Sequence, residues 1–116
     1  MKTIIAGSRH IVNPYSLLEA LDLCGWEPTL VLCGMARGVD TLGRIWAEEI
    51  EVPWVPYPAK WRTNGKLDMS AGRKRNILMA QNAEALIAIW DGVSSGTGHM
   101  IDTARKYNLR SYVHFI

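Results

Sequence analysis

Short apolar runs alternate with amphipathic segments along the whole chain. Five apolar runs are predicted strands: residues 2–6, 29–33, 53–57, 85–90 and 111–116. Four segments with apolar residues at helical spacing are predicted helices: residues 14–25, 38–51, 72–83 and 97–108. Strands that alternate with helices are typical of a parallel sheet covered on both faces. The pattern therefore predicts a single α/β domain over residues 1–116.

The connections also predict the order of the strands. Right-handed crossovers give a doubly wound sheet, for which we expect the order 3-2-1-4-5 with a switch between the first and fourth strands. Prolines in 53–57 favour an edge position for that strand. The run 85–90 is the most apolar and is expected at the centre. Residues 58–71 lack periodicity and are predicted to form a loop.

The sequence also indicates the ends of the first predicted helix and the apolar faces of the first two. Asn13 and Pro14 are typical of a helix start, and Gly25 is typical of a position just after a helix end. The apolar faces expected for the first two helices are Leu17, Leu18 and Leu21, and Val39, Leu42, Ile45, Trp46 and Ile50.

Composition narrows the class of protein. Hydrophobic residues make up 48% of the chain and charged residues 21%, as in ordinary globular domains. The net charge of +2 gives no strong electrostatic reason to expect nucleic acid or an anionic membrane.

The first apolar run is too short for a signal peptide. Cys24 and Cys33 are not spaced as a metal site or a redox pair, so we expect a cytoplasmic protein without metal or cofactor.

Glycine-rich loops follow three strands that should be neighbours in the sheet: "GSR" (7–9), "GMARGVD" (34–40) and "DGVSSGTG" (91–98). Ligands of doubly wound sheets bind at this edge, at the switch point. Glycines let backbone N–H groups approach a ligand, and a helix start offers unpaired N–H groups to an anion. The loops predict a ligand that carries phosphate. The alternative is that Thr97 only caps a helix and the glycines only permit turns.

The candidate ligand-binding residues come mainly from these loops. They are Gly7, Ser8, Arg9, Gly34, Arg37, Gly38, Asp40, Trp61, Asn76, Gly92, Ser94, Ser95, Gly96 and Thr97. Trp61 can stack on a base or cover the sheet edge. Arg9 and Arg37 can reach a phosphate or remain solvated charges. The cations "RKR" (73–75) oppose the dipole of the helix that they begin, which favours an anion contact by at least one of them.

Four segments together resemble the SLOG superfamily: "AGSR" (6–9), "CGMARGVDTLGRIWA" (33–47), "GRKRNILM" (72–79) and "ALIAIWDGVSSGTGHMIDTA" (85–104). The chain is most similar to the small YpsA-related branch, which is common in bacterial and phage genomes. The superfamily also includes the LOG phosphoribohydrolases and the DNA-processing protein A. The resemblance covers nearly the whole chain. It implies a Rossmann-like fold that binds nucleotides or nucleotide-derived molecules.

The LOG motifs are matched only in part. The LOG pattern R-x-x-x-M matches "RNILM" and places its arginine on Arg75. In P-G-G-x-G-T-x-x-E, Gly96 and Thr97 match G-T, the proline is absent, and two residues are inserted after Gly92. Met100 occupies the glutamate position. A methionine cannot stabilise the oxocarbenium-like state of glycoside cleavage, as a carboxylate can.

Hydrolysis here would need another carboxylate. Asp91 and Asp40 are the candidates, because both should lie at the carboxyl edge of the sheet. The alternatives are that Asp40 is a first-turn acid which favours the helix dipole, and that Asp91 forms an Asx-turn.

The sequence predicts a nucleotide-binding domain with a sensing or sequestering role and leaves two alternatives. One is LOG-like hydrolysis of a nucleoside monophosphate, with Arg75 and Asp91 as catalytic residues. The other is binding of single-stranded nucleic acid along a basic edge, formed by Lys60, Arg62, Lys66, Arg73, Lys74 and Arg75. Because LOG proteins pair, the resemblance also implies a homodimer or a higher homo-oligomer.

Overall fold

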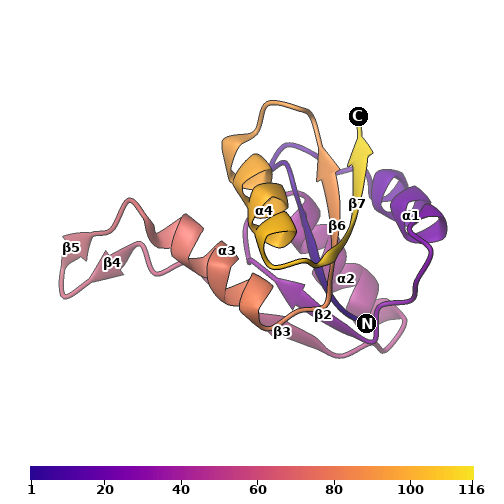
Figure 1. Cartoon of the computed structure of the whole chain (residues 1–116), viewed down its shortest axis with the longest axis horizontal. Coiled ribbons are helices and arrows are strands. Elements are labelled where there is room, and N and C mark those ends of the chain that lie inside the picture. The colour runs from indigo at the N-terminus through magenta and orange to yellow at the C-terminus, as the bar shows by residue number, and fades with distance from the viewer.

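The computed structural model describes residues 1–116 and contains a five-stranded, all-parallel sheet (Figure 1). Its strands are β1 (Lys2–Gly7), β2 (Leu30–Cys33), β3 (Trp54–Pro56), β6 (Ala85–Trp90) and β7 (Arg110–Phe115). Their spatial order is β3-β2-β1-β6-β7, which confirms the predicted order 3-2-1-4-5 and the edge position of β3. The sheet is flanked by helices α1 (Pro14–Leu23), α2 (Val39–Glu49), α3 (Ala71–Gln81) and α4 (Ser95–Lys106).

The helices cover both faces of the sheet, so the fold has three layers and is Rossmann-like. Side chains of β1 and β6 alternate between the faces because successive strand residues point to opposite sides. Ile5, Ile87 and Ile89 pack with α1 and α2, whereas Ile4 and Leu86 pack with α3 and α4. The loops after β1 and β6 therefore diverge to opposite faces, which opens the switch point between these two strands.

Several helix boundaries and faces differ from the prediction. Asn13 caps α1 as expected, since its Oδ1 accepts a hydrogen bond from the Tyr15 amide at 3.0 Å. However, α4 begins at Ser95, two residues earlier than predicted, and its N-cap is Ser94 rather than Thr97.

Leu18, Ile45 and Ile50 are exposed, so their predicted place on the inner faces is wrong. Small residues face the sheet instead: a Cβ on Gly43 would lie only 2.8 Å from the Ile5 side chain. At Gly43 the backbone of α2 therefore packs directly on the sheet. Larger side chains of this region, such as Ile45, point away from that contact.

Residues 58–71 were predicted to be a loop, and this is wrong for their central part. They contain a hairpin of β4 (Arg62–Thr63) and β5 (Lys66–Leu67), which extends away from the sheet and helices (Figure 1). Its turn residues Asn64 and Gly65 have φ values of +53° and +76°, as a type I′ turn requires. The paired strands have two residues each, which is too short for any alternation to be visible in the sequence.

The remaining sequence expectations concern the cysteines and the membrane. Cys33 is a core residue, as expected, and burial raises the pKa of its thiol to about 12. Both cysteines are free thiols. No helix of this chain combines the length and the apolar character that crossing a membrane requires.

Candidate ligand-binding site

A pocket of about 550 Å³ lies where the loops after β1, β2 and β6 meet. Many of the predicted ligand residues line it: Gly7, Ser8, Arg9, Asp40, Trp61, Arg75, Asn76, Ser94, Ser95, Gly96 and Thr97. Gly34 and Arg37 line a second, adjoining pocket of about 820 Å³. Gly38, Asp91 and Gly92 line neither pocket. The fold thus brings together residues from all three glycine-rich loops.

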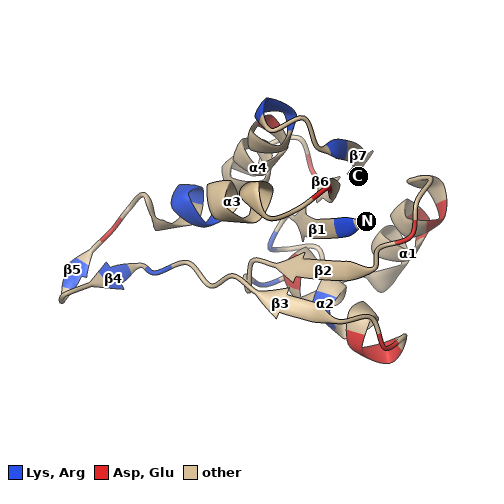
Figure 2. Ribbon diagram, turned by 60° about the horizontal axis from the view of Figure 1, so that its bottom comes forward, with Lys and Arg blue, Asp and Glu red and all other residues tan.

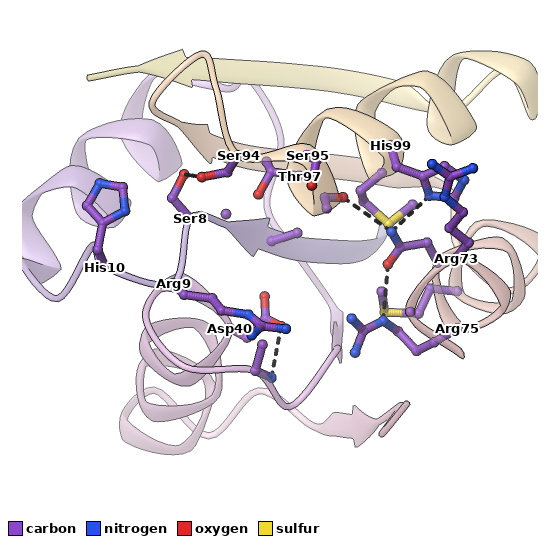
Figure 3. A pocket seen from close by; sticks show the side chains of 18 of the residues that line it. Ser8, Arg9, His10, Asp40, Arg73, Arg75, Ser94, Ser95, Thr97 and His99 are labelled. Atoms are coloured by element: carbon purple, nitrogen blue, oxygen red, sulfur yellow. Dashed lines mark hydrogen bonds between the residues drawn. The ribbon is translucent and has the colours of Figure 1, made fainter. Parts of the chain in front are cut away.

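The first turn of α4 faces the first pocket and is open to an anion. The backbone N–H groups of Ser95, Gly96 and Thr97 have no acceptor within the protein, and this turn contains no acidic residue. The Thr97 side chain points into the pocket (Figure 3), is only 6% exposed, and its hydroxyl has no hydrogen-bond partner. A Cβ on Gly96 would meet nothing within 4 Å. Packing within the protein therefore does not require a glycine at this position.

The start of α2, by contrast, carries an anion of its own. Asp40 lies in the first turn of α2, is 6% exposed, and its Oδ2 accepts a hydrogen bond from the Ala36 amide at 3.1 Å. Burial raises the pKa of Asp40, and the Ala36 hydrogen bond and the charges of Arg75 and Arg9 only partly oppose this. Its other oxygen has no hydrogen-bond partner in the protein and belongs to a side chain that lines the pocket.

Arg75 is held by backbone carbonyls rather than by a carboxylate. Its Nη1 donates hydrogen bonds to the carbonyl oxygens of Gly34 and Tyr57, and its Nε donates to Asn76 Oδ1 at 3.1 Å. Its Nη2 has no acceptor in the protein. A Cβ on Gly34 would lie 2.8 Å from both Arg75 Nη1 and Asp40 Oδ2, so only glycine permits this arrangement.

Asn76 links Arg75 to His99, and these two residues lie on the same side of the pocket (Figure 3). Because Asn76 Oδ1 accepts from Arg75, its Nδ2 must donate, and it contacts the Gly96 carbonyl at 3.3 Å and His99 Nδ1 at 3.1 Å. The neutral His99 ring therefore carries its proton on Nε2. Burial, followed by the positive charge of Arg73, lowers the pKa of His99.

His99 is a pocket residue that the sequence prediction missed. Gly96, His99 and Met100 are spaced at i, i+3 and i+4 on α4, and all three line the pocket. This spacing from the glycine-rich turn is the signal that could have identified it. Met100, at the glutamate position of the LOG motif, is 1% exposed and belongs to the core.

The three cations at the start of α3 have different environments. Lys74 Nζ pairs with Asp68 Oδ2 at 2.8 Å, and this contact is the main cause that lowers the pKa of Asp68 to about 2. Arg75 is turned toward the carbonyls described above. Arg73 has no acceptor and lines the pocket, as Arg9 does. The pocket thus contains three guanidinium groups and one carboxylate, that of Asp40.

Asp91 shapes the loop before α4. Its Oδ1 accepts hydrogen bonds from the amides of Val93 at 2.9 Å and Ser94 at 2.8 Å, and its Oδ2 accepts from the Ser94 hydroxyl at 2.8 Å. These hydrogen bonds lower the pKa of Asp91 to about 2. The carboxylate is therefore committed to the Asx-turn that the sequence left as an alternative, although this does not test a catalytic role. Gly92, with a φ of +84°, completes the turn.

Trp61 lies at the boundary of the two pockets, is 42% exposed, and its ring lies over Gly72. The six cations of the predicted basic edge come from two elements. Lys60, Arg62 and Lys66 lie in the hairpin and the residues just before it, whereas Arg73, Lys74 and Arg75 belong to α3 (Figure 2).

No family model matches this chain, and no curated protein or solved structure matches it either. The proposed function therefore rests on the geometry and the charge of the site.

Proposed function

We propose that this protein binds a nucleotide or a nucleotide-derived small molecule, with its phosphate at the start of α4, and acts as a sensor or a sequestering protein. The observation that carries the proposal is the open first turn of α4. Three backbone N–H groups and the Thr97 hydroxyl lie there without partners in the protein, and the hydroxyl is accessible from the pocket. An anion in this position gains their hydrogen bonds and the favourable end of the helix dipole.

The surrounding residues suit the rest of a nucleotide. Arg73 and Arg9 supply positive charge without an internal acceptor. The Asp40 oxygen that has no partner can accept a hydrogen bond from a ribose hydroxyl, and the exposed ring of Trp61 can stack on a base. The resemblance of the three loops to the SLOG superfamily supports the same proposal.

Titration calorimetry with the 5′-monophosphates of the four common nucleosides tests it. We expect binding of at least one of them, and none of the corresponding free nucleoside. Arg73→Gln should weaken binding about tenfold, since a charge-assisted hydrogen bond contributes about 1.5–3 kcal/mol. Arg105→Gln, which removes an exposed cation in the last turn of α4, is the matched control. Absence of binding at millimolar nucleotide would contradict the proposal.

A second candidate is hydrolysis of the N-glycosidic bond, and the position of Asp40 favours it. Asp40 is the one carboxylate that lines the pocket, and it lies beside Arg75. A carboxylate in this position can stabilise the oxocarbenium-like state or activate water.

Chromatography of the released base tests this candidate. Asp40→Asn should abolish turnover while nucleotide binding persists, and Asp91→Asn should retain turnover if it only shapes the loop. If the wild-type protein releases no base, or if Asp40→Asn releases it at the same rate, hydrolysis by this site is excluded.

A further inference from the structure

The second pocket is continuous with the first through shared walls. Arg9, His10, Ala36, Trp61 and Arg75 line both pockets. The first pocket measures about 550 Å³ and the second about 820 Å³. A mononucleotide whose phosphate occupies the start of α4 leaves the second pocket available for a further group of the same ligand.

The second pocket is strongly cationic. Three arginines line it, Arg9, Arg37 and Arg75, and no aspartate or glutamate does. Arg9 and Arg37 make no hydrogen bond or ion pair within the protein, and Arg75 Nη2 is also without an acceptor. Like charges at one pocket repel one another, and an anion bound there would relieve this repulsion. Burial is the main cause that lowers the pKa of Arg75, the charge of Asp40 raises it, and the charge of Arg9 lowers it by a smaller amount.

The two pockets share Trp61 and differ in their other anion-binding groups. The start of α4 and Arg73 line only the first pocket, Arg37 lines only the second, and Trp61 lines both. Met35 and Pro58 add apolar surface to the second pocket. A ligand that fills both pockets and suits these groups has a planar group for Trp61 and one anionic group in each pocket.

We propose that the two pockets form one site for a nucleoside bisphosphate, in which the two phosphates occupy separate positions on the ribose. One phosphate lies at the first turn of α4, the other lies among Arg9, Arg37 and Arg75, and the base lies against Trp61. This inference rests on the proposed function and specifies its ligand.

A nucleotide inside a single strand also has phosphates on both sides, so the site must be distinguished from a strand-binding surface. The structure favours the small molecule because its acceptor-free arginines lie in the two pockets. The cations that a longer strand would also need, Lys60, Arg62 and Lys66, line neither pocket, and Arg62 and Lys66 belong to the hairpin strands β4 and β5.

The experiment compares two ligands that carry the same number of phosphates at different positions of the ribose. For the base whose 5′-monophosphate binds most tightly, calorimetry measures the affinity of the 5′-diphosphate and of the 3′,5′-bisphosphate. We expect the bisphosphate to bind at least tenfold more tightly than the diphosphate. Arg37→Gln should remove this advantage, because Arg37 lines only the second pocket. Arg105→Gln, remote from both pockets, should change neither affinity, and thermal unfolding confirms that each variant is folded.

Each other outcome has a distinct meaning. Equal affinities for the diphosphate and the bisphosphate would overturn the bisphosphate site and leave the proposed function intact. Failure of every 5′-monophosphate and bisphosphate to bind would overturn both. An Arg37→Gln variant that keeps the bisphosphate advantage would exclude the second pocket as its origin. A twelve-residue single-stranded oligonucleotide that binds more tightly than the bisphosphate, and loses affinity on Arg62→Gln, would assign the site to a strand instead.

Discussion

Thr97 and Thr103 lie on the same helix and differ in what their hydroxyl groups contact. The Thr97 side chain is 6% exposed and its hydroxyl makes no hydrogen bond in the protein. Every fully buried side-chain nitrogen and oxygen has a hydrogen-bond partner, so the Thr97 hydroxyl is accessible from the pocket that it lines. Thr103 is equally buried, but its hydroxyl donates to the His99 carbonyl at 2.7 Å. Under the proposed function, the Thr97 hydroxyl donates to the bound phosphate.

Thr97→Val keeps the shape of the side chain and removes the hydroxyl. We expect the free energy of unfolding to stay the same or rise, because no hydrogen bond within the protein is lost. The nucleotide affinity should fall tenfold or more, because a hydrogen bond to a charged phosphate contributes about 1.5–3 kcal/mol. Thr103→Val should show the opposite pattern, with a loss of about 1 kcal/mol in stability and an unchanged affinity. Urea denaturation and calorimetry on both variants check this, and an unchanged affinity in Thr97→Val would count against the phosphate position.

His99 provides a test of the pocket charge. Burial is the main cause that lowers its pKa, Arg73 and Lys106 add to this, and Asp102 opposes it. The folded protein therefore favours the neutral ring. The stability that His99 contributes is fully present above its unfolded pKa of about 6.5, and it declines as the pH falls below that value.

Arg73→Gln should raise the pKa of His99, while burial keeps this pKa below the ordinary value. NMR titration of the ring protons measures it directly. Lys74→Gln is the control, because Lys74 pairs with Asp68 and is not among the causes of the His99 shift. If the His99 titration is identical in Arg73→Gln and in the wild type, then Arg73 does not place its charge in the pocket.

Residue identity alone could not rank the two candidate carboxylates. Asp40 and Asp91 both follow strands whose carboxyl ends meet at one edge, and the sequence predicts catalysis by Asp91 and ligand binding by Asp40. The structure separates them by their partners. Both oxygens of Asp91 accept hydrogen bonds from its own loop, whereas one Asp40 oxygen has no partner. Such hydrogen bonding depends on the loop path, which no periodicity encodes.

At the scale of elements, the helices that follow β2 and β6 differ in how their first turns are neutralised. The first turn of α2 contains Asp40, whose Oδ2 accepts the Ala36 amide. The first turn of α4 contains no acid, and Gly96 leaves it open. Both helix starts favour negative charge, but only the first turn of α2 contains a carboxylate of the protein itself.

Gly96→Glu should therefore stabilise the protein and abolish phosphate binding. Replacing a helical glycine contributes about 0.5–1 kcal/mol, and a carboxylate in the first turn contributes about 0.3–1 kcal/mol. The same carboxylate repels a phosphate and occupies its place. Gly96→Gln is the isosteric control, which should keep the glycine contribution to stability without the charge repulsion. Thermal unfolding and calorimetry measure the two effects, and a Glu variant that binds nucleotide as the wild type does would refute the α4 site.

Most elements were predictable because buried strands and amphipathic helices leave periodic patterns. The bounds predicted for the strand β6, residues 85–90, are those observed, since five of its six residues, Ala85–Ile89, are buried. The hairpin was missed because β4 and β5 are short and exposed on both faces. Their sequences therefore show no alternation of apolar and polar residues that would indicate strands. Its turn dipeptide Asn64-Gly65 was the one local signal available.

At the scale of the whole molecule, the strand order was the step that made the site predictable. Once β1 lies between β2 and β6, the three glycine-rich loops must meet at one edge. The division of this edge into two pockets was not predictable, because it depends on the conformation of the loop after β2 and on the position of the Trp61 side chain. Arg37 lines only the second pocket, although the sequence places it in the same loop as Asp40.

The hairpin can be separated from the rest of the molecule. The Asp68 amide donates to the Trp61 carbonyl at 2.7 Å, so the two ends of the hairpin already lie side by side. Replacing residues 62–67 by Asn-Gly should change the free energy of unfolding by less than about 0.5 kcal/mol, because isolated two-stranded hairpins are marginally stable. The longest dimension, now 42 Å against 28 and 27 Å, should shorten in solution scattering. Nucleotide affinity should persist, since Trp61 is retained and no residue of 62–67 lines either pocket. A large loss of nucleotide affinity would show that the hairpin takes part in the site.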